Sequence, residues 1–193
     1  MTRFIALLRG VNVGKAKRVP MAELRRILTE LGCTDVRTLL NSGNAVFGAP
    51  AARTPARLAT DLAQELRAQF GVDVPVIVKR ASDLDAIVRG NPLSFRDDDH
   101  SRLLVAFTAE PRALAALDAI RPVLAKGEQF AIGAKAAWLL CANGILDSRA
   151  GEALLGKAGR AATTRNWATV LKLQALASAP PPEAGGQLPR RGR

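Results

Sequence analysis

The sequence has few of the side chains on which catalytic and metal sites depend. Its 193 residues include one histidine, two cysteines and no tyrosine. Cys33 and Cys141 lie far apart and form no C-x-x-C pair, so we expect two reduced packing residues and no metal site. The run Asp97-Asp98-Asp99 before His100 is more typical of a solvated turn than of a metal cluster.

Long apolar runs are also missing. Arg9 interrupts the N-terminal run Phe4–Leu8 where the core of a signal peptide would continue. No run approaches the length of about 20 residues that spans a bilayer. The 48% hydrophobic content indicates a folded core. We therefore expect a soluble cytoplasmic protein with no membrane partner.

Positive charge is in excess. The 28 Lys and Arg outnumber the 17 Asp and Glu, which gives a net charge of +11. This balance favours an anionic partner, either a small molecule or nucleic acid. The alternative is a compositional bias with no functional meaning. Part of the charge lies in the Pro/Gly/Arg-rich segment 179–193, which we expect to be a disordered tail.

Hydrophobic periodicity and turn residues predict an α+β fold built from two tandem ferredoxin-like subdomains. The first, 1–80, has the order β-α-β-β-α-β, with elements at 3–9, 20–31, 36–40, 45–47, 54–70 and 74–79. The second, 81–178, nearly repeats this order and adds a C-terminal helix over 166–177. We expect it to be incomplete or modified, because its final strand is missing or reduced to 161–163.

A glycine-rich stretch, RGVNVGKAKRVPM, follows the first strand at residues 9–21. Backbone N–H groups of such loops bind phosphate in many folds, although the spacing here fits neither a Walker A loop nor a dinucleotide fingerprint. In a split β-α-β unit the first two strands are parallel, so this loop and the turn Asn41-Ser42-Gly43-Asn44 should be neighbours. The candidate ligand-binding residues here are Arg9, Gly10, Asn12, Gly14, Lys15, Ser42 and Asn44.

A third polar stretch, Thr163–Trp167, opens the last predicted helix, with Thr164 as its N-cap. Thr164, Arg165 and Asn166 complete the candidate set. Structural alternatives stay open for every residue. Asn12 could brace its loop, Ser42 and Asn44 could close a turn, Lys15 could lie on a solvated rim, and Arg165 could be an ordinary surface cation.

Three stretches together resemble the domain-of-unknown-function 1697 family: LLRGVNVGKAKRVPMAELR, LLNSGNAVF and ATTRNWATVLKL. The family motifs are close to LLRGINVGG, QSGN-V-F and ATTRNW-TV-KL, and the match spans residues 3–177. The resemblance implies two ferredoxin-like subdomains and no particular activity. It includes every candidate residue except Lys15, where the family commonly has a second glycine. Leu40-Asn41 also departs from the family, which has an aliphatic residue and glutamine there.

The candidate residues predict an anion pocket between the subdomains. Whether it catalyses a reaction stays open, and no cofactor can be named. Catalysis there would rest on electrostatic stabilisation by Arg9 and Arg165. Nucleic-acid binding is the alternative, although Asn44–Gly48 lacks the aromatic pattern of the RNA-recognition module. A non-enzymatic interaction protein is the third hypothesis, and the oligomeric state stays open.

Overall fold

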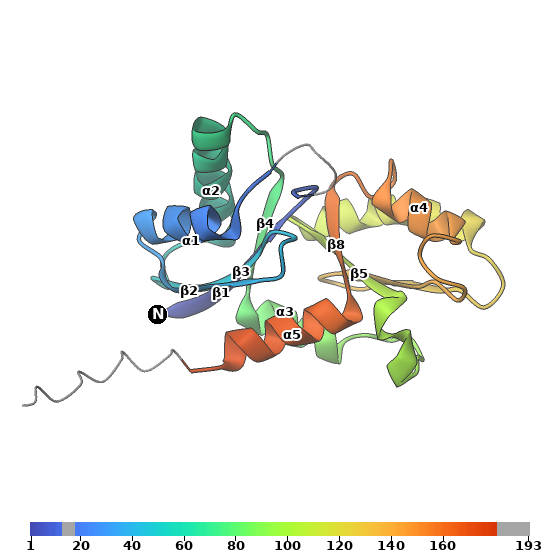
Figure 1. The fold of residues 1–193 in the computed structure, drawn as a ribbon. Helices are drawn as coiled ribbons and strands as arrows, with labels where there is room; N and C mark the ends of the chain where they lie inside the picture. The colour runs from blue at the N-terminus through green and yellow to red at the C-terminus, as the bar shows by residue number, and fades with distance from the viewer. Residues whose placement is uncertain (13–17, 181–193) are drawn as a thin grey trace, which may run out of the picture.

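The structure, a computed structural model, describes residues 1–12 and 18–180. Its first half is a four-stranded antiparallel sheet with strand order β2-β3-β1-β4, covered on one face by two helices (Figure 1). The elements follow in the order β1 (Thr2–Leu8), α1 (Met21–Glu30), β2 (Thr34–Leu39), β3 (Asn44–Ala49), α2 (Pro55–Phe70) and β4 (Val76–Arg80). The predicted α+β class and the order of these elements are confirmed.

The second half contains another four-stranded antiparallel sheet, with strand order β6-β7-β5-β8. Strand for strand, this order matches that of the first sheet. The elements are α3 (Ala81–Arg89), the 3-10 helices η1 (Asp97–Ser101) and η2 (Pro111–Val123), β5 (Leu103–Thr108), β6 (Gln129–Ile132), β7 (Ala137–Leu140), α4 (Arg149–Leu155), β8 (Ala162–Asn166) and α5 (Trp167–Ser178).

The expectation of an incomplete second half is wrong at its last strand. Strand β8 pairs with β5 over its whole length, from Leu104 opposite Asn166 to Thr108 opposite Ala162. Two β-branched threonines in this strand suit a pleated, half-buried surface. Thr164 is therefore a strand residue and not a helix N-cap. The cap of α5 is Asn166, whose Oδ1 accepts a hydrogen bond from the Thr169 N–H at 3.0 Å.

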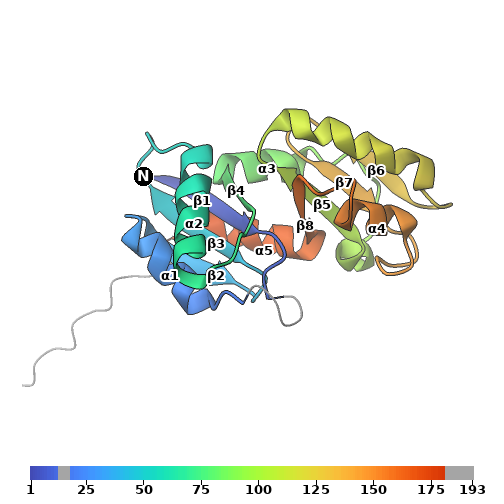
Figure 2. The same cartoon turned by 90° about the horizontal axis from the view of Figure 1, so that it is seen from above.

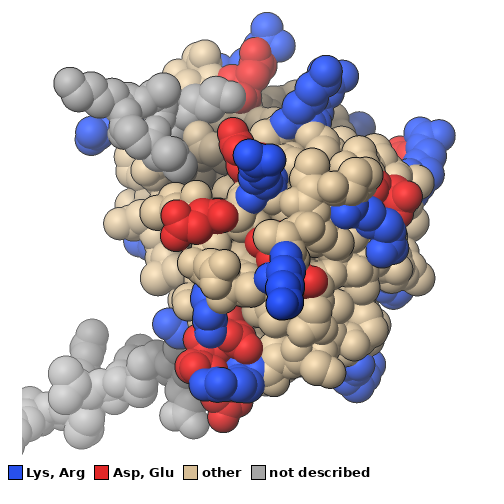
Figure 3. Space-filling model, turned by 90° about the vertical axis from the view of Figure 1, so that its right-hand side faces the viewer, with Lys and Arg blue, Asp and Glu red and all other residues tan. Residues whose placement is uncertain are grey.

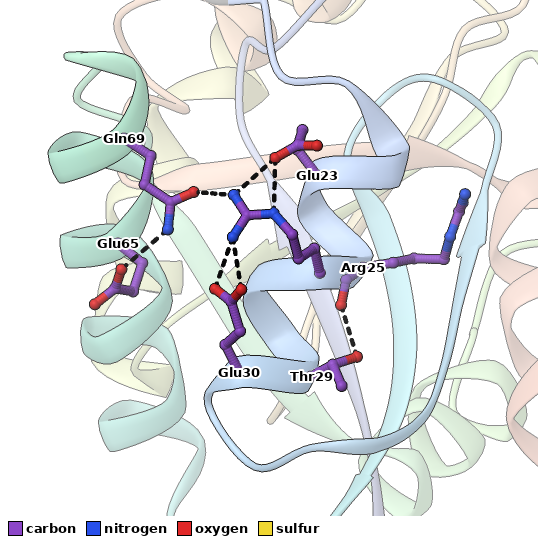
Figure 4. A network of polar contacts seen from close by, with 7 residues as sticks. Glu23, Arg25, Thr29, Glu30, Glu65 and Gln69 are labelled. Carbon is purple, nitrogen blue, oxygen red and sulfur yellow. Dashed lines mark hydrogen bonds and ion pairs between the residues drawn. The ribbon is translucent and has the colours of Figure 1, made fainter.

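Helices α1 and α2 cover the outer face of the first sheet through leucines spaced four residues apart, such as Leu24 and Leu28 on α1. Polar side chains of the two helices, among them Glu23, Glu30 and Gln69, form a cluster (Figure 4) that Arg26 of α1 joins. Its guanidinium contacts Glu23 and Glu30 on the same helix and Gln69 on α2. Part of the positive charge near the N-terminus is thus neutralised within α1.

Three apolar clusters hold the layers together. One lies between the first sheet and α1 and α2, and another between the second sheet and η2 and α4. The central cluster joins the halves: it combines Ile5 and Val46 of the first sheet, Val105 of the second, and Val170 of α5. Figures 1 and 2 show that α5 lies on the side of the first sheet opposite α1 and α2. It contacts strands of both sheets.

The residues that follow α5 contact β1 and β2 of the first sheet. The Arg3 guanidinium donates to the Ala179 carbonyl at 3.4 Å, and Arg37 donates to the Pro180 carbonyl at 2.6 Å. Both arginines also contact Asp35. Among the described residues, no helix combines the length and the apolar character needed to cross a membrane.

Candidate functional site

The loop after β1 lies against the turn between β2 and β3, as the topology predicts. The Leu8 N–H donates to the Gly43 carbonyl at 2.8 Å, and the Asn12 side chain donates to the Asn41 carbonyl at 2.7 Å. Gly43 has a φ of 74°, and a Cβ there would lie 2.6 Å from both the Leu8 Cβ and the Val11 Cγ2. Only glycine allows this left-handed backbone to approach β1 so closely.

Asn12 braces its own loop. Its side-chain amide donates to the Val19 carbonyl and accepts from the Val19 N–H, both at 2.9 Å. Asn12 adopts a φ of 57°, a left-handed conformation that asparagine tolerates better than most residues. The bracing role thus accounts for both ends of its amide. Gly14 and Lys15 lie outside the described residues, and their predicted part in the site stays a prediction.

Asn44 is fully buried at the start of β3. Its Nδ2 donates to the Leu39 carbonyl at 3.0 Å and to the Ser42 Oγ at 2.9 Å, so it closes the turn. Its Oδ1 accepts from Nε of Arg165, which comes from the other half of the protein. One buried amide therefore connects the turn of the first sheet to β8 of the second.

Arg165 bridges the two halves. In β8 it lies opposite Val105, a central-core residue on β5, so cross-strand geometry directs its side chain toward the first sheet. Besides Asn44, the guanidinium donates to the Leu8 carbonyl at 2.8 Å and the Ser42 carbonyl at 3.1 Å. Within its own strand it donates to the Thr163 hydroxyl at 3.0 Å and the Thr164 carbonyl at 2.7 Å.

These contacts occupy all five N–H donors of the guanidinium. Every acceptor is neutral, and no carboxylate of a described residue pairs with Arg165. Burial lowers the pKa of Arg165 to about 10, so the side chain is charged at neutral pH. Arg165 is thus a half-buried cation without a compensating anion in the described chain, and not the surface arginine of the structural alternative.

Arg9 makes the complementary connection from the first half to the second. Its backbone N–H donates to the Pro75 carbonyl at 3.0 Å. Its guanidinium donates to the carbonyl of Leu155, at 3.5 Å, and to that of Arg160. Leu155 is the last residue of α4, and a cation is favourable beside the free carbonyls of a helix C-terminus. No described carboxylate pairs with Arg9 either.

A cleft of about 440 Å³ opens between the halves beside both arginines. The first half contributes the residues that follow β1 and the serine of the turn, and the second contributes the end of α4 and part of β8: Leu8, Arg9, Gly10, Val11, Ser42, Leu154, Leu155, Ala162, Thr163, Thr164 and Arg165. Five of the candidate residues, Arg9, Gly10, Ser42, Thr164 and Arg165, therefore line one cleft. Asn12, Asn44 and Asn166 do not.

The backbone after Arg9 has an unusual conformation at the edge of this cleft. Gly10 and Asn12 have φ values of 66° and 57°, while Val11 between them is not in the positive-φ region. Alternation of this kind brings successive N–H groups together in anion-binding turns. The N–H groups of Gly10 and Val11 donate no hydrogen bond within the described part of the chain. Within residues 1–12 and 18–180 these two N–H groups therefore have no partner.

The described lining of the cleft holds no histidine, cysteine or carboxylate. Both cysteines are buried elsewhere, and burial raises the pKa of each thiol. His100 contacts the ring of Phe95, with centroids 5.8 Å apart. Across residues 1–12 and 18–180, no three His, Cys, Asp or Glu side chains gather as a metal site would require. The charged side chains of the described lining are thus the two arginines, and no described residue there is an evident nucleophile or base.

Sequence reasoning missed the apolar wall of the cleft and the carbonyls that Arg9 binds. Leu154 and Leu155 look like ordinary apolar residues of a short helix, and Arg160 follows it in a turn. No local motif marks them. They enter the site because the second sheet places α4 beside the loop after β1.

Comparison with known protein families supports the family that the sequence resembles, over a shorter range than the expected 3–177 that leaves out the third stretch, ATTRNWATVLKL. Residues 1–138 match the model of a protein family of unknown function, DUF1697, and the chain belongs to this family. Among solved structures, it is similar to the conserved bacterial protein SP0830 from Streptococcus pneumoniae. The identity is 26%, the TM-score is 0.75, and the match covers 91% of this chain and 98% of that one. No curated protein matches the sequence.

Proposed function

We propose that this DUF1697 protein binds a small anion, bearing phosphate or carboxylate, in the cleft between its two halves. Arg9 and the N–H groups of Gly10 and Val11 are the proposed donors. Ser42 of the first half and Thr164 of the second line the same cleft, and we propose that their hydroxyls complete the coordination. Gly14 and Lys15 are expected to contribute from the same loop.

The observation that carries the proposal is the pairing of two guanidinium groups at one cleft with carbonyls instead of carboxylates. A buried charge is normally paired with an opposite charge, because desolvation is costly. At an effective dielectric constant of about 20, an anion about 5 Å from one cation gains roughly 3 kcal/mol of Coulomb energy. A bound anion would supply the compensation that the described chain does not.

The two arginines have different roles in this proposal. Arg165 contributes charge and position only, because its five donors are already used. Arg9 uses its two Nη atoms for one contact each, so it retains donors for a ligand. Asn12, Asn44 and Asn166 support the loop, the turn and the helix start respectively. We propose that they shape the site without touching the ligand.

The fold assignment is also a proposal in its finer detail. We infer that each half is a ferredoxin-like subdomain, 1–80 and 81–178, because the two sheets share one strand order and one order of elements. The central apolar cluster draws on both sheets, which supports a fixed relation between the subdomains. The cleft then has two walls of constant geometry.

Nucleic-acid binding through a basic surface remains the competing hypothesis. On the face shown in Figure 3, basic and acidic side chains alternate, and no continuous surface of one sign forms. Many arginines pair with neighbouring acids, such as Arg53 with Asp61 and Arg121 with Asp118. This mixture favours a localised anion site over a diffuse basic surface.

Thermal unfolding across a ligand panel tests the proposal. The panel holds inorganic phosphate, nucleotides, sugar phosphates, simple carboxylates and short oligonucleotides, each at two salt concentrations. A ligand at about 100 times its dissociation constant adds roughly 2.7 kcal/mol, which corresponds to a midpoint shift of about 5–11 °C.

The matched variants are Arg9→Ala, which removes the proposed donor, and Arg149→Ala, which removes an exposed arginine outside the cleft lining. We expect a small anion to stabilise the wild type and Arg149→Ala, but to stabilise Arg9→Ala much less. If only oligonucleotides act, equally on all three proteins and only at low salt, the pocket proposal is wrong and the basic-surface hypothesis is favoured.

A further inference from the structure

We infer that the ligand of the cleft is an amphipathic anion: a carboxylate or phosphate monoester that carries an aliphatic chain. This inference rests on the proposed function and specifies its ligand class. The anionic group lies at Arg9 and the Gly10–Val11 backbone, and the chain extends along the apolar wall formed by α4.

The lining of the cleft supports an apolar tail. Five of its eleven residues are aliphatic: Leu155, which is 49% exposed, and four that are each 3% exposed or less, namely Leu8, Val11, Leu154 and Ala162. Ligand pockets are generally lined by apolar side chains with a few polar groups that fix orientation, and they occupy about 300–1,000 Å³. A volume of about 440 Å³ is in this range, and a single phosphate group would leave most of it to water.

Leu155 is the residue most directly available to the chain. Its side chain is 49% exposed at the C-terminal end of α4, whereas Leu154 beside it is 1% exposed and belongs to the core below. Its own backbone carbonyl accepts a hydrogen bond from Arg9. The cationic and the apolar part of the cleft are therefore joined at one residue, which is the arrangement an amphipathic anion requires.

A polar ligand of the same charge fits less well. The described lining offers few side chains besides the arginines that could hydrogen-bond a sugar or a base, namely Ser42, Thr163 and Thr164. The Thr163 hydroxyl already accepts from Arg165. Covering exposed apolar surface is favourable by about 25 cal/mol per Å², so an aliphatic tail gains affinity where a hydroxylated one must lose its water.

The test is titration calorimetry with a homologous series: acetate, butyrate, hexanoate and octanoate below its micellar range, with inorganic phosphate, hexyl phosphate and hexanol beside them. Each methylene that becomes buried should tighten binding about fourfold. We expect hexanoate to bind at least tenfold more tightly than acetate, hexyl phosphate to exceed phosphate by a similar factor, and hexanol to show no binding. The two headgroups together distinguish a fatty-acid ligand from an alkyl phosphate.

Two leucine variants localise the tail. Leu155→Ala keeps the backbone carbonyl that Arg9 binds, and should reduce the ratio of hexanoate to acetate affinity at least threefold. Leu146→Ala removes a side chain that is 99% exposed and outside the lining, and should leave the ratio unchanged. Equal binding of acetate and hexanoate to the wild type would overturn the inference while the anion site stands. If neither phosphate nor any carboxylate binds, or if hexanol binds as well as hexanoate, the proposed function itself is wrong.

Discussion

Replacing Arg165 by lysine keeps the positive charge between the two halves but removes the planar guanidinium that makes the five contacts. An ammonium group has three donors against the five of a guanidinium, so at least two of the five acceptors lose their partner. Water can reach acceptors at the cleft, such as the Ser42 carbonyl, but Asn44 is 0% exposed, so its Oδ1 depends on the residue at position 165 for a partner.

Each hydrogen bond from a charged donor contributes about 1.5–3 kcal/mol, and rehydration at the cleft recovers part of the loss. We therefore expect Arg165→Lys to lower the free energy of unfolding by about 2–4 kcal/mol, and the thermal midpoint by roughly 4–16 °C. Urea and thermal unfolding at neutral pH measure both quantities.

The control is Arg149→Lys, at an exposed arginine in the first turn of α4. Its change should stay within about 0.5 kcal/mol, as is usual for a surface substitution. If Arg165→Lys changes stability as little as this control, the five contacts do not hold the halves together. The reasoning about the bridge would then be refuted.

Three further predictions concern the loop, the turn and the strand edge. Gly43→Ala should lower the free energy of unfolding in urea by about 2–5 kcal/mol, because a Cβ there combines a left-handed backbone with overlap against Leu8. Gly10→Ala has the same backbone strain but open space around the new Cβ, so it should lower this free energy by only about 1–2 kcal/mol. Equal losses in the two variants would contradict the packing argument. Asn12→Ala removes the side-chain oxygen that accepts a hydrogen bond from the Val19 N–H, so hydrogen exchange at this N–H should accelerate at least tenfold. An unchanged rate would mean that other contacts fix the conformation of the loop. The hydrogen bond from Arg37, and then that from Arg3, lower the pKa of Asp35 in the folded state, so the stability that Asp35 contributes is present at neutral pH and is lost as the pH falls below about 4. In Asp35→Asn, the free energy of unfolding should therefore fall less steeply with decreasing pH in this acid range than in the wild type. Parallel profiles of the two proteins would argue against the ion pairs.

The local part of the fold could be predicted because short patterns determine it. Thr54 caps α2 and Gly71 ends it with a φ of 64°, as expected from their residue types. The meeting of the first loop with the Ser42 turn follows from the parallel direction of β1 and β2, which needs no knowledge of side-chain contacts.

Strand β8 illustrates where local patterns compete. The sequence Ala162–Asn166 lacks large apolar residues and contains threonines that also serve as helix caps, so it resembles a helix start. Pairing with β5, a fully buried strand, decides the outcome. Tertiary context thus overrides the local preference.

The contacts that Arg165 and Arg9 make between the halves depend on how the sheets are placed. Arg165 and Asn44 are 121 residues apart in the sequence, and Arg9 is separated from Arg160 by 151. Both bonds form only if the two sheets lie in a particular relative position, and the apolar core that they share determines that position. The motifs identified five of the lining residues, but their meeting in one cleft with Leu154 and Leu155 follows from that placement.

The claim that an anion binds at the loop after β1 is tested most directly by an amide NMR titration with inorganic phosphate at moderate salt, in the wild type and in Arg9→Ala. Saturable shifts centred on the N–H resonances of Gly10 and Val11, and absent from the variant, are the predicted result. Shifts that spread over arginines across the surface and vanish with added salt, or no shifts at Gly10 and Val11 at all, would contradict the account.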